Sequence, residues 1–156
     1  MHDMLVRLYD LPGLEEALAD VAAHGVSVRP PLAQERPAVV AWVRANFANQ
    51  AAEVEAAFTR EPATCFVAMR DSTMVGFACY DVTCLNFFGP EGVGANERGK
   101  GIGRALLLAT LHAQRAQGYA YSIIGGVGPA EFYAKTVGAV AIEGSTPGIY
   151  AARLGT

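Results

Sequence analysis

Residues Phe88-Gly-Pro-Glu-Gly-Val-Gly-Ala-Asn-Glu-Arg-Gly-Lys-Gly-Ile-Gly-Arg104 lead directly into the apolar run Ala105 to Ala109. The pattern predicts an extended segment, a glycine-rich turn and then a helix. Three glycines leave the backbone of the turn uncovered, so that helix-start N–H groups can approach a ligand: Gly99, Gly101 and Gly103. Three cationic side chains flank them: Arg98, Lys100 and Arg104. Because a helix start already carries partial positive charge, this combination predicts an anion-binding site.

Two familiar phosphate-binding patterns do not fit this stretch. A P-loop reads G-x-x-x-x-G-K-[ST], and Gly94 with Gly99-Lys100 satisfies its first part, but Gly101 stands where a magnesium-binding hydroxyl belongs. The dinucleotide fingerprint G-x-G-x-x-G requires a third glycine where Leu106 lies. A glycine-rich turn that only caps a helix is the simplest alternative, and the clustered cations argue against it.

Composition limits the class of protein. The chain has 156 residues, of which 52% are hydrophobic, and its formal net charge is −3. This predicts one compact domain and argues against nucleic-acid binding. No apolar run approaches the length of a membrane span, so we expect a cytoplasmic protein that does not enter membranes. Three cysteines and three histidines are scattered along the chain, which predicts reduced core thiols and no metal site.

Hydrophobic periodicity predicts alternating strands and helices along the whole chain. Strands are expected at 4–9, 26–29, 64–69, 74–82, 84–88, 119–124, 140–143 and 149–154, the last two as a closing pair. Helices are expected near 14–22, 35–47, 50–60, 101–117 and 129–136. The Gly89-Pro90 pair and Gly92 predict a bulge or splay in the strand before the glycine loop. This order predicts an α/β (α+β) fold with one mixed central sheet flanked by helices.

Three features resemble the GCN5-related N-acetyltransferase (GNAT) family. Arg98-Gly-Lys-Gly-Ile-Gly103 matches the R-x-x-G-x-G loop that binds the pyrophosphate of acetyl-coenzyme A in that family. The splayed strand precedes it, and Ala130-Glu-Phe-Tyr-Ala-Lys135 resembles the family's F-Y-x-K-x-G-F pattern. The similarity runs from Val26 to Leu154. We therefore predict a GNAT domain at 26–156 and an added strand–helix extension at 1–25.

The resemblance implies transfer of an acetyl group from acetyl-coenzyme A to a primary amine, by direct attack through a tetrahedral intermediate. The residues that it assigns to the coenzyme are Val93, Arg98, Gly99, Lys100, Gly101, Gly103 and Arg104. Pantetheine would pair like an extra strand against the backbone near Val93, where an N–H could also stabilise the oxyanion. Tyr133 becomes the candidate acid that protonates the leaving thiolate. Its alternative role is core packing beside Phe132.

The sequence departs from the family at two positions. Gly126 replaces the Asn that often opens the loop after the expected strand at 119–124, so that residue's hydrogen bond is lost or taken by water. Phe87 lies where several relatives have a Glu or His base, and it cannot accept a proton. Glu91, four residues on, is the candidate base, because a half-buried carboxylate has a raised pKa. A solvated turn residue is the equal alternative for Glu91, and Asp81 or a water relay also stays open.

The leading expectation is an enzyme acting on a small-molecule amine. A coenzyme-A-binding module without catalysis, and a protein N-acetyltransferase, are the alternatives. Between the two helices expected at 35–47 and 50–60, four residues could line an acceptor pocket: Asn46, Phe47, Asn49 and Gln50. The last strands leave open a homodimer formed by pairing two chains.

Overall fold

The computed structural model describes residues 1–155. The strands are β1 (Met4–Arg7), β2 (Val26–Arg29), β3 (Cys65–Arg70), β4 (Thr73–Tyr80), β5 (Phe87–Val93), β6 (Tyr121–Ile124) and β7 (Val140–Ala141). The helices are α1 (Leu14–Ala22), α2 (Arg36–Asn46), α3 (Ala51–Ala57), α4 (Ile102–Ala116) and α5 (Ala130–Val137). Most predicted elements are therefore present, with bounds shifted by a few residues.

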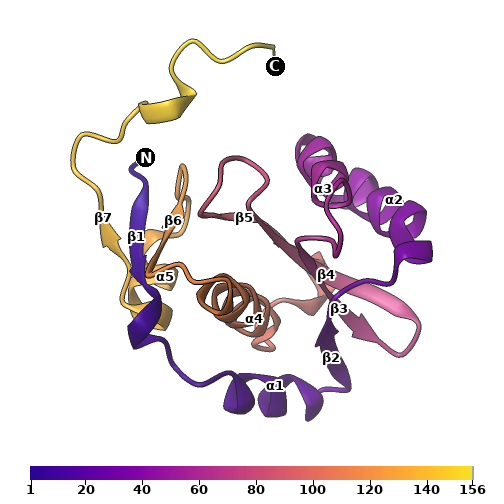
Figure 1. Cartoon of the computed structure of the whole chain (residues 1–156). Helices are drawn as coiled ribbons and strands as arrows, with labels where there is room; N and C mark the ends of the chain where they lie inside the picture. Colours follow the sequence, from indigo (N-terminus) through magenta and orange to yellow (C-terminus); the bar gives the residue numbers. More distant parts are fainter. Residues whose placement is uncertain (156) are drawn as a thin grey trace.

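All seven strands form one sheet in the order β2-β3-β4-β5-β6-β1-β7. β5 and β6 run parallel, and the other neighbouring pairs are antiparallel. The parallel pair is connected by α4, which crosses one face of the sheet (Figure 1). This is the mixed sheet that the order of elements predicts.

Helices cover both faces of the sheet, and each face has its own core (Figure 1). On one face, α4 packs with α1 and α5 over an apolar layer that contains Phe88 and Ile124. On the other face, α2 and α3 pack over a layer that contains Phe77. The run Leu106, Leu107 and Leu108 is fully buried because α4 lies between the sheet and α1. The predicted α/β fold class is confirmed.

The predicted closing strand at 149–154 is wrong. Residues Gly148–Tyr150 form a 3-10 helix, and residues 151–155 contain no strand. The reason is that β1 occupies the position beside β6, with Met4 opposite Ile124, and β1 also pairs with β7 on its other edge. Hydrogen bonding along β6 is therefore completed by the beginning of the chain rather than by its end.

Residues 1–25 share a core with the rest of the chain. Val6, Leu8 and Val21 are fully buried in the same apolar layer as α4. That residues 1–25 are an added extension before a domain at 26–156 stays a prediction.

None of the helices in residues 1–155 is long and apolar enough to cross a membrane.

Candidate functional site

The glycine-rich turn has the backbone geometry that its sequence predicts. Gly99 and Gly101 have φ values of 80° and 81°, a left-handed conformation that strains other residues. Gly101 is the N-cap of α4, and the N–H of Ala105 donates the first helical hydrogen bond to its carbonyl at 3.1 Å. The N–H groups of residues 102–104 therefore have no partner within the helix and are available to an anion.

The sheet opens between β5 and β6. These strands pair only at Phe87 with Ile123 and at Phe88 with Ile124, after which β5 continues alone to Val93. The register of β5 against β4 shifts between Ala78 and Tyr80, which confirms the predicted bulge. An unpaired strand edge thus faces the gap.

Hydrogen-bond alternation shows which backbone groups of β5 point into that gap. Gly94 donates its N–H to the carbonyl of Val75 at 2.8 Å, and Gly92 lies opposite Phe77 in the same register. In an antiparallel pair every second residue bonds to its neighbour. The backbone groups of Glu91 and Val93 therefore point away from β4, toward the open side. The sequence had singled out only Val93 for this role.

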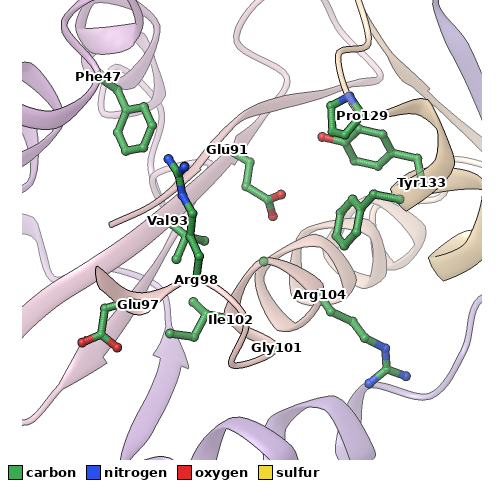
Figure 2. A pocket seen from close by; sticks show the side chains of 14 residues that line it. Phe47, Glu91, Val93, Glu97, Arg98, Gly101, Ile102, Arg104, Pro129 and Tyr133 are labelled. Carbon is green, nitrogen blue, oxygen red and sulfur yellow. The ribbon is translucent and has the colours of Figure 1, made fainter. Parts of the chain in front are cut away.

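A cavity of about 510 Å³, called here the large cavity, joins this edge to the glycine turn. Its lining residues come from four segments: Glu91–Val93, Glu97–Gly99 with Gly101–Arg104, Pro129 with Phe132 and Tyr133, and Phe47. All the predicted site residues except Lys100 line it. Figure 2 shows Glu91 and Tyr133 directed into the large cavity from β5 and α5.

The three cations of the glycine turn are not equivalent. Lys100 Nζ lies 3.1 Å from Glu97 Oε2, and Arg70 pairs with the same carboxylate at 2.6 Å. Arg104 pairs with Asp20 of α1 at 3.7 Å. Arg98 is exposed at the rim and forms no ion pair within residues 1–155. Lys100 and Arg104 therefore each have a carboxylate partner, one turn away for Lys100 and on α1 for Arg104, and the predicted binding of an anion at this turn stays a prediction.

Glu91 has an unusual environment for a carboxyl group. Its Oε1 is buried and has no hydrogen-bond partner within the described chain. Its Oε2 would lie only 3.9 Å from a Cβ added at Gly103, so the carboxyl group lies against the first turn of α4. Burial raises the pKa of Glu91 well above its ordinary value. The solvated-turn alternative is therefore wrong, because Glu91 lies within β5 with its Oε1 buried, and the carboxyl group keeps its proton to a higher pH than a solvated glutamate does.

Tyr133 is buried against two aromatic rings. Its ring centroid lies 5.1 Å from that of Phe132 and 6.2 Å from that of Phe88. Burial, and then the charge of Glu91, raise the pKa of Tyr133 above its ordinary value. The phenol therefore stays protonated across the physiological range and carries a proton that it can donate. Tyr133 thus packs in the core and also lines the large cavity.

A sequence model of the acetyltransferase (GNAT) family matches residues 32–138, which is more than half of the chain. The chain belongs to the GNAT family. The family is one of acyl-coenzyme A N-acyltransferases, and its members use acetyl-coenzyme A. A search of curated proteins gives no match.

Solved structures of other GNAT proteins share the fold at low sequence identity. One is a GCN5-related glucosamine N-acetyltransferase region of a fungal multi-domain GH3 beta-N-acetylglucosaminidase, with 15% identity and a TM-score of 0.76 over 90% of this chain and 19% of that one. Another is a GCN5-related N-acetyltransferase from Sphaerobacter thermophilus, with 17% identity and a TM-score of 0.67. The match covers 90% of this chain and 48% of that one. A third is an aminoglycoside acetyltransferase from an uncultured soil metagenomic sample, with 14% identity and a TM-score of 0.53. The match covers 72% of this chain and 88% of that one. This chain thus spans about a fifth of the length of the fungal protein and about half of the length of the Sphaerobacter protein.

The loop that begins at Gly125 and departs from the family pattern at Gly126 is contacted by Asp3, near the beginning of the chain, and by Tyr150, near its end. The N–H of Gly126 donates to Asp3 Oδ1 at 2.8 Å, and the ring of Tyr150 would lie 3.5 Å from a Cβ at Gly126. Phe87 lies beside Tyr150, because both would contact a Cβ at Gly125. Asp3 and Tyr150 could not be predicted as loop contacts from the sequence, since each lies more than 20 residues from the loop it contacts.

No group of three His, Cys, Asp or Glu residues within 1–155 is arranged to hold a metal ion.

Proposed function

We propose that this GNAT acetyltransferase transfers the acetyl group of acetyl-coenzyme A directly to a primary amine of a small molecule. The observation that carries the proposal is the junction of three features in one cavity. These are the open edge of β5, the helix start of α4 with its unused N–H groups, and a buried carboxyl group facing a buried phenol.

The glycine turn fits the pyrophosphate of the coenzyme. Gly99 and Gly101 hold the backbone in a left-handed conformation, and Gly103 leaves the first turn of α4 bare. N–H groups 102–104 and the exposed Arg98 would bind phosphate oxygens. Arg104 and Lys100 would contribute long-range attraction, because each is already paired with a carboxylate.

The unpaired edge of β5 fits the pantetheine arm. Strand edges recruit extended ligands through backbone hydrogen bonds, and Glu91 and Val93 offer such groups toward the gap. When bound, the coenzyme supplies an activated acetyl thioester. A backbone N–H on this edge would stabilise the oxyanion of the tetrahedral intermediate formed when the amine attacks.

Glu91 and Tyr133 divide the proton transfers between them. Glu91 would accept a proton from the attacking amine, for which a carboxyl group with a raised pKa is better suited than a solvated one. Tyr133 would donate its phenolic proton toward the leaving thiolate. Glu91 belongs to β5 and Tyr133 to α5, and the fact that both side chains line the large cavity supports this division of roles.

Arg98→Ala is expected to weaken acetyl-coenzyme A binding about tenfold or more, because it removes a charge-assisted contact to phosphate. Lys100→Ala is expected to weaken binding less, since its ammonium group is held by Glu97. Calorimetric titration of the wild type and both variants measures this. An unchanged affinity in Arg98→Ala, or no binding by the wild type, would contradict the placement of the pyrophosphate.

Tyr133→Phe is expected to lower kcat for acetyl transfer by about 10²-fold or more while leaving coenzyme affinity within about twofold. The reason is that the substitution removes only the phenolic oxygen and keeps the ring that packs against Phe88 and Phe132, so it changes the chemistry more than the packing. Thiol release in the presence of a panel of small amines measures the rate. Phe132→Leu is a control for the neighbouring packing. Equal rates in wild type and Tyr133→Phe would remove Tyr133 from the mechanism.

A further inference from the structure

We propose that Gln114 and Ser122 fix the separation of β5 and β6 where the sheet opens, and that they are positioning residues for the pantetheine arm of the coenzyme. Gln114 belongs to α4, and Ser122 belongs to β6. Both residues are fully buried although both are polar. The inference rests on the proposed function, because it assigns the gap between β5 and β6 to pantetheine.

Gln114 joins the two strands that diverge at the gap. Its Nε2 donates to the carbonyl of Phe87, in β5, at 3.2 Å. Its Oε1 accepts a hydrogen bond from Ser122 Oγ, in β6, at 2.7 Å. The helix that carries Gln114 lies against both strands (Figure 1). One side chain therefore ties β5 to β6, and we call these two hydrogen bonds the strand bridge.

The strand bridge lies where β5 and β6 still pair. The N–H of Ile123 donates to the carbonyl of Asn86 at 3.0 Å. Phe87 and Ser122, the two ends of the strand bridge, are the chain neighbours of this pair. After Phe88 the two strands, within residues 1–155, no longer pair with each other. The contacts at this point therefore determine the separation and angle at which the gap begins.

A buried amide at this position does more than fill space. Leu107 and Leu111, on the preceding turns of α4, are fully buried without any polar group. A buried amide destabilises the fold unless its donor and its acceptor both find partners, and at Gln114 both do. Apolar packing tolerates a range of distances, whereas hydrogen bonds require particular ones. The strand bridge therefore adds a fixed geometry to the burial.

The width of the gap matters to a ligand that pairs with β5. The backbone groups of Glu91 and Val93 point into the gap. An extended arm that lies between two strands needs them roughly 9.5 Å apart, which is about twice the spacing of neighbouring strands. Without the strand bridge, β5 and β6 would move closer together or further apart, and an arm bound between them would lose contacts.

The pyrophosphate turn lies far from the strand bridge. Gln114 is twelve positions after Ile102, the first residue of α4, which corresponds to roughly 18 Å along the helix axis. Loss of the strand bridge is therefore expected to weaken binding of the pantetheine arm and to leave binding of the pyrophosphate unchanged.

The test compares two ligands that differ by the arm. Acetyl-coenzyme A contains the acetylated pantetheine, whereas 3′-phospho-ADP is the rest of the same molecule. Gln114→Met keeps the length of the side chain and removes both hydrogen bonds. We expect it to weaken acetyl-coenzyme A binding about tenfold and to leave the affinity for 3′-phospho-ADP within about twofold, as measured by calorimetric titration. Ser122→Ala removes one of the two bonds and is expected to give a smaller effect in the same direction.

Thr110→Val is the matched control. Thr110 is also polar and fully buried on α4, but its hydroxyl donates to the carbonyl of Leu106, in the same helix, at 2.7 Å. The substitution therefore removes a buried hydrogen bond without touching the strand bridge, and both affinities are expected to stay at their wild-type values. If Gln114→Met weakens both ligands alike, or if Thr110→Val shows the same selective loss, the positioning role is overturned.

Hydrogen exchange followed by NMR tests the strand bridge without a ligand. Relative to the N–H of Leu107 in α4, the N–H of Ile123 is expected to exchange about tenfold faster in Gln114→Met and at the wild-type ratio in Thr110→Val. An unchanged ratio in Gln114→Met overturns the inference even if the enzyme is active. If Gln114→Met does not fold, Ser122→Ala serves for both measurements.

The two measurements separate this inference from the proposed function. If the wild type does not bind acetyl-coenzyme A, the proposed function fails, and with it the role assigned to the gap. Faster exchange at Ile123 would then still support the strand bridge as the contact that fixes β5 against β6. If the coenzyme binds but Gln114→Met binds it as tightly as the wild type does, the inference fails while the proposed function stands.

Discussion

Glu91→Gln is expected to slow acetyl transfer by about 10²–10⁴-fold and, at the same time, to make the folded protein more stable at neutral pH. The catalytic loss follows because an amide cannot accept the proton of the attacking amine. The gain in stability follows because the substitution keeps the shape of the side chain and removes a carboxyl group whose ionised form is disfavoured by burial.

The sign of the pH dependence follows from the direction of the pKa shift. Below the ordinary pKa of a glutamate, folded and unfolded chains both keep the proton, and Glu91 contributes no difference. As the pH rises above that value, the unfolded chain releases the proton while the folded chain retains it, because the folded pKa is raised. The wild type therefore loses stability with rising pH until the folded pKa is passed, and the stabilisation of Glu91→Gln grows over the same interval.

Two measurements test this pair of effects. Denaturant unfolding at pH 5 and pH 8 gives the free energy of unfolding of each protein, and the pH profile of kcat shows whether an ascending limb disappears in the variant. Glu143→Gln is the control, because Glu143 is exposed and forms no ion pair in the described chain. A stable variant with wild-type kcat would reassign the base to Asp81 or to a water relay. A destabilised variant would mean that Glu91 is satisfied in the folded state.

A chain that begins at Val26 is expected not to fold. Removing residues 1–25 deletes β1 from between β6 and β7 and removes five buried core residues: Met4, Val6, Leu8, Ala17 and Val21. Truncating a single large core side chain costs about 2–5 kcal/mol, and the whole stability of a domain is about 5–15 kcal/mol. The loss therefore exceeds what the remaining chain can tolerate.

Circular dichroism during heating measures this effect, and the truncated chain is expected to show no cooperative transition. The single variant Leu8→Ala is expected to lower stability by about 2–5 kcal/mol, whereas Tyr9→Ala, at an exposed neighbour, is expected to change it little. A chain that ends at Tyr150 provides a second control, since residues 151–155 are exposed. Cooperative unfolding of the chain from Val26 would instead support the predicted boundary at residue 25.

The glycine turn and the bulge were predictable because both depend on local chemistry. Gly99 and Gly101 adopt backbone angles that few other residues tolerate, and Gly89-Pro90 interrupts a strand ladder wherever it occurs. The local pattern predicted the short helix that carries Tyr133, whereas the candidate role of Tyr133 came from the resemblance of residues 130–135 to the family's F-Y-x-K-x-G-F pattern. In each case the residues that determine the conformation lie within about ten positions of one another.

The charge state of the turn was not predictable in the same way. Arg98, Lys100 and Arg104 look alike in sequence, but Asp20 on α1 and Glu97 with Arg70 distinguish them in space. The burial of Glu91 was also undecided, because a residue after Gly89-Pro90 is equally consistent with an exposed turn. Its pKa depends on α4 and α5, which close over it only in the folded chain.

Local sequence therefore established an α/β chain with a glycine-rich anion loop before its longest helix, since helix periods, glycine angles and proline breaks operate over neighbouring residues. The tertiary structure established three other features: which strand pairs with β6, which carboxylate pairs with Arg104, and how Phe47 comes to lie against β5 in the large cavity. Each of these joins residues far apart in the chain. Strand edges, ion pairs and cavities are satisfied by whichever partner packing brings close, and the pattern of any one segment does not specify that partner.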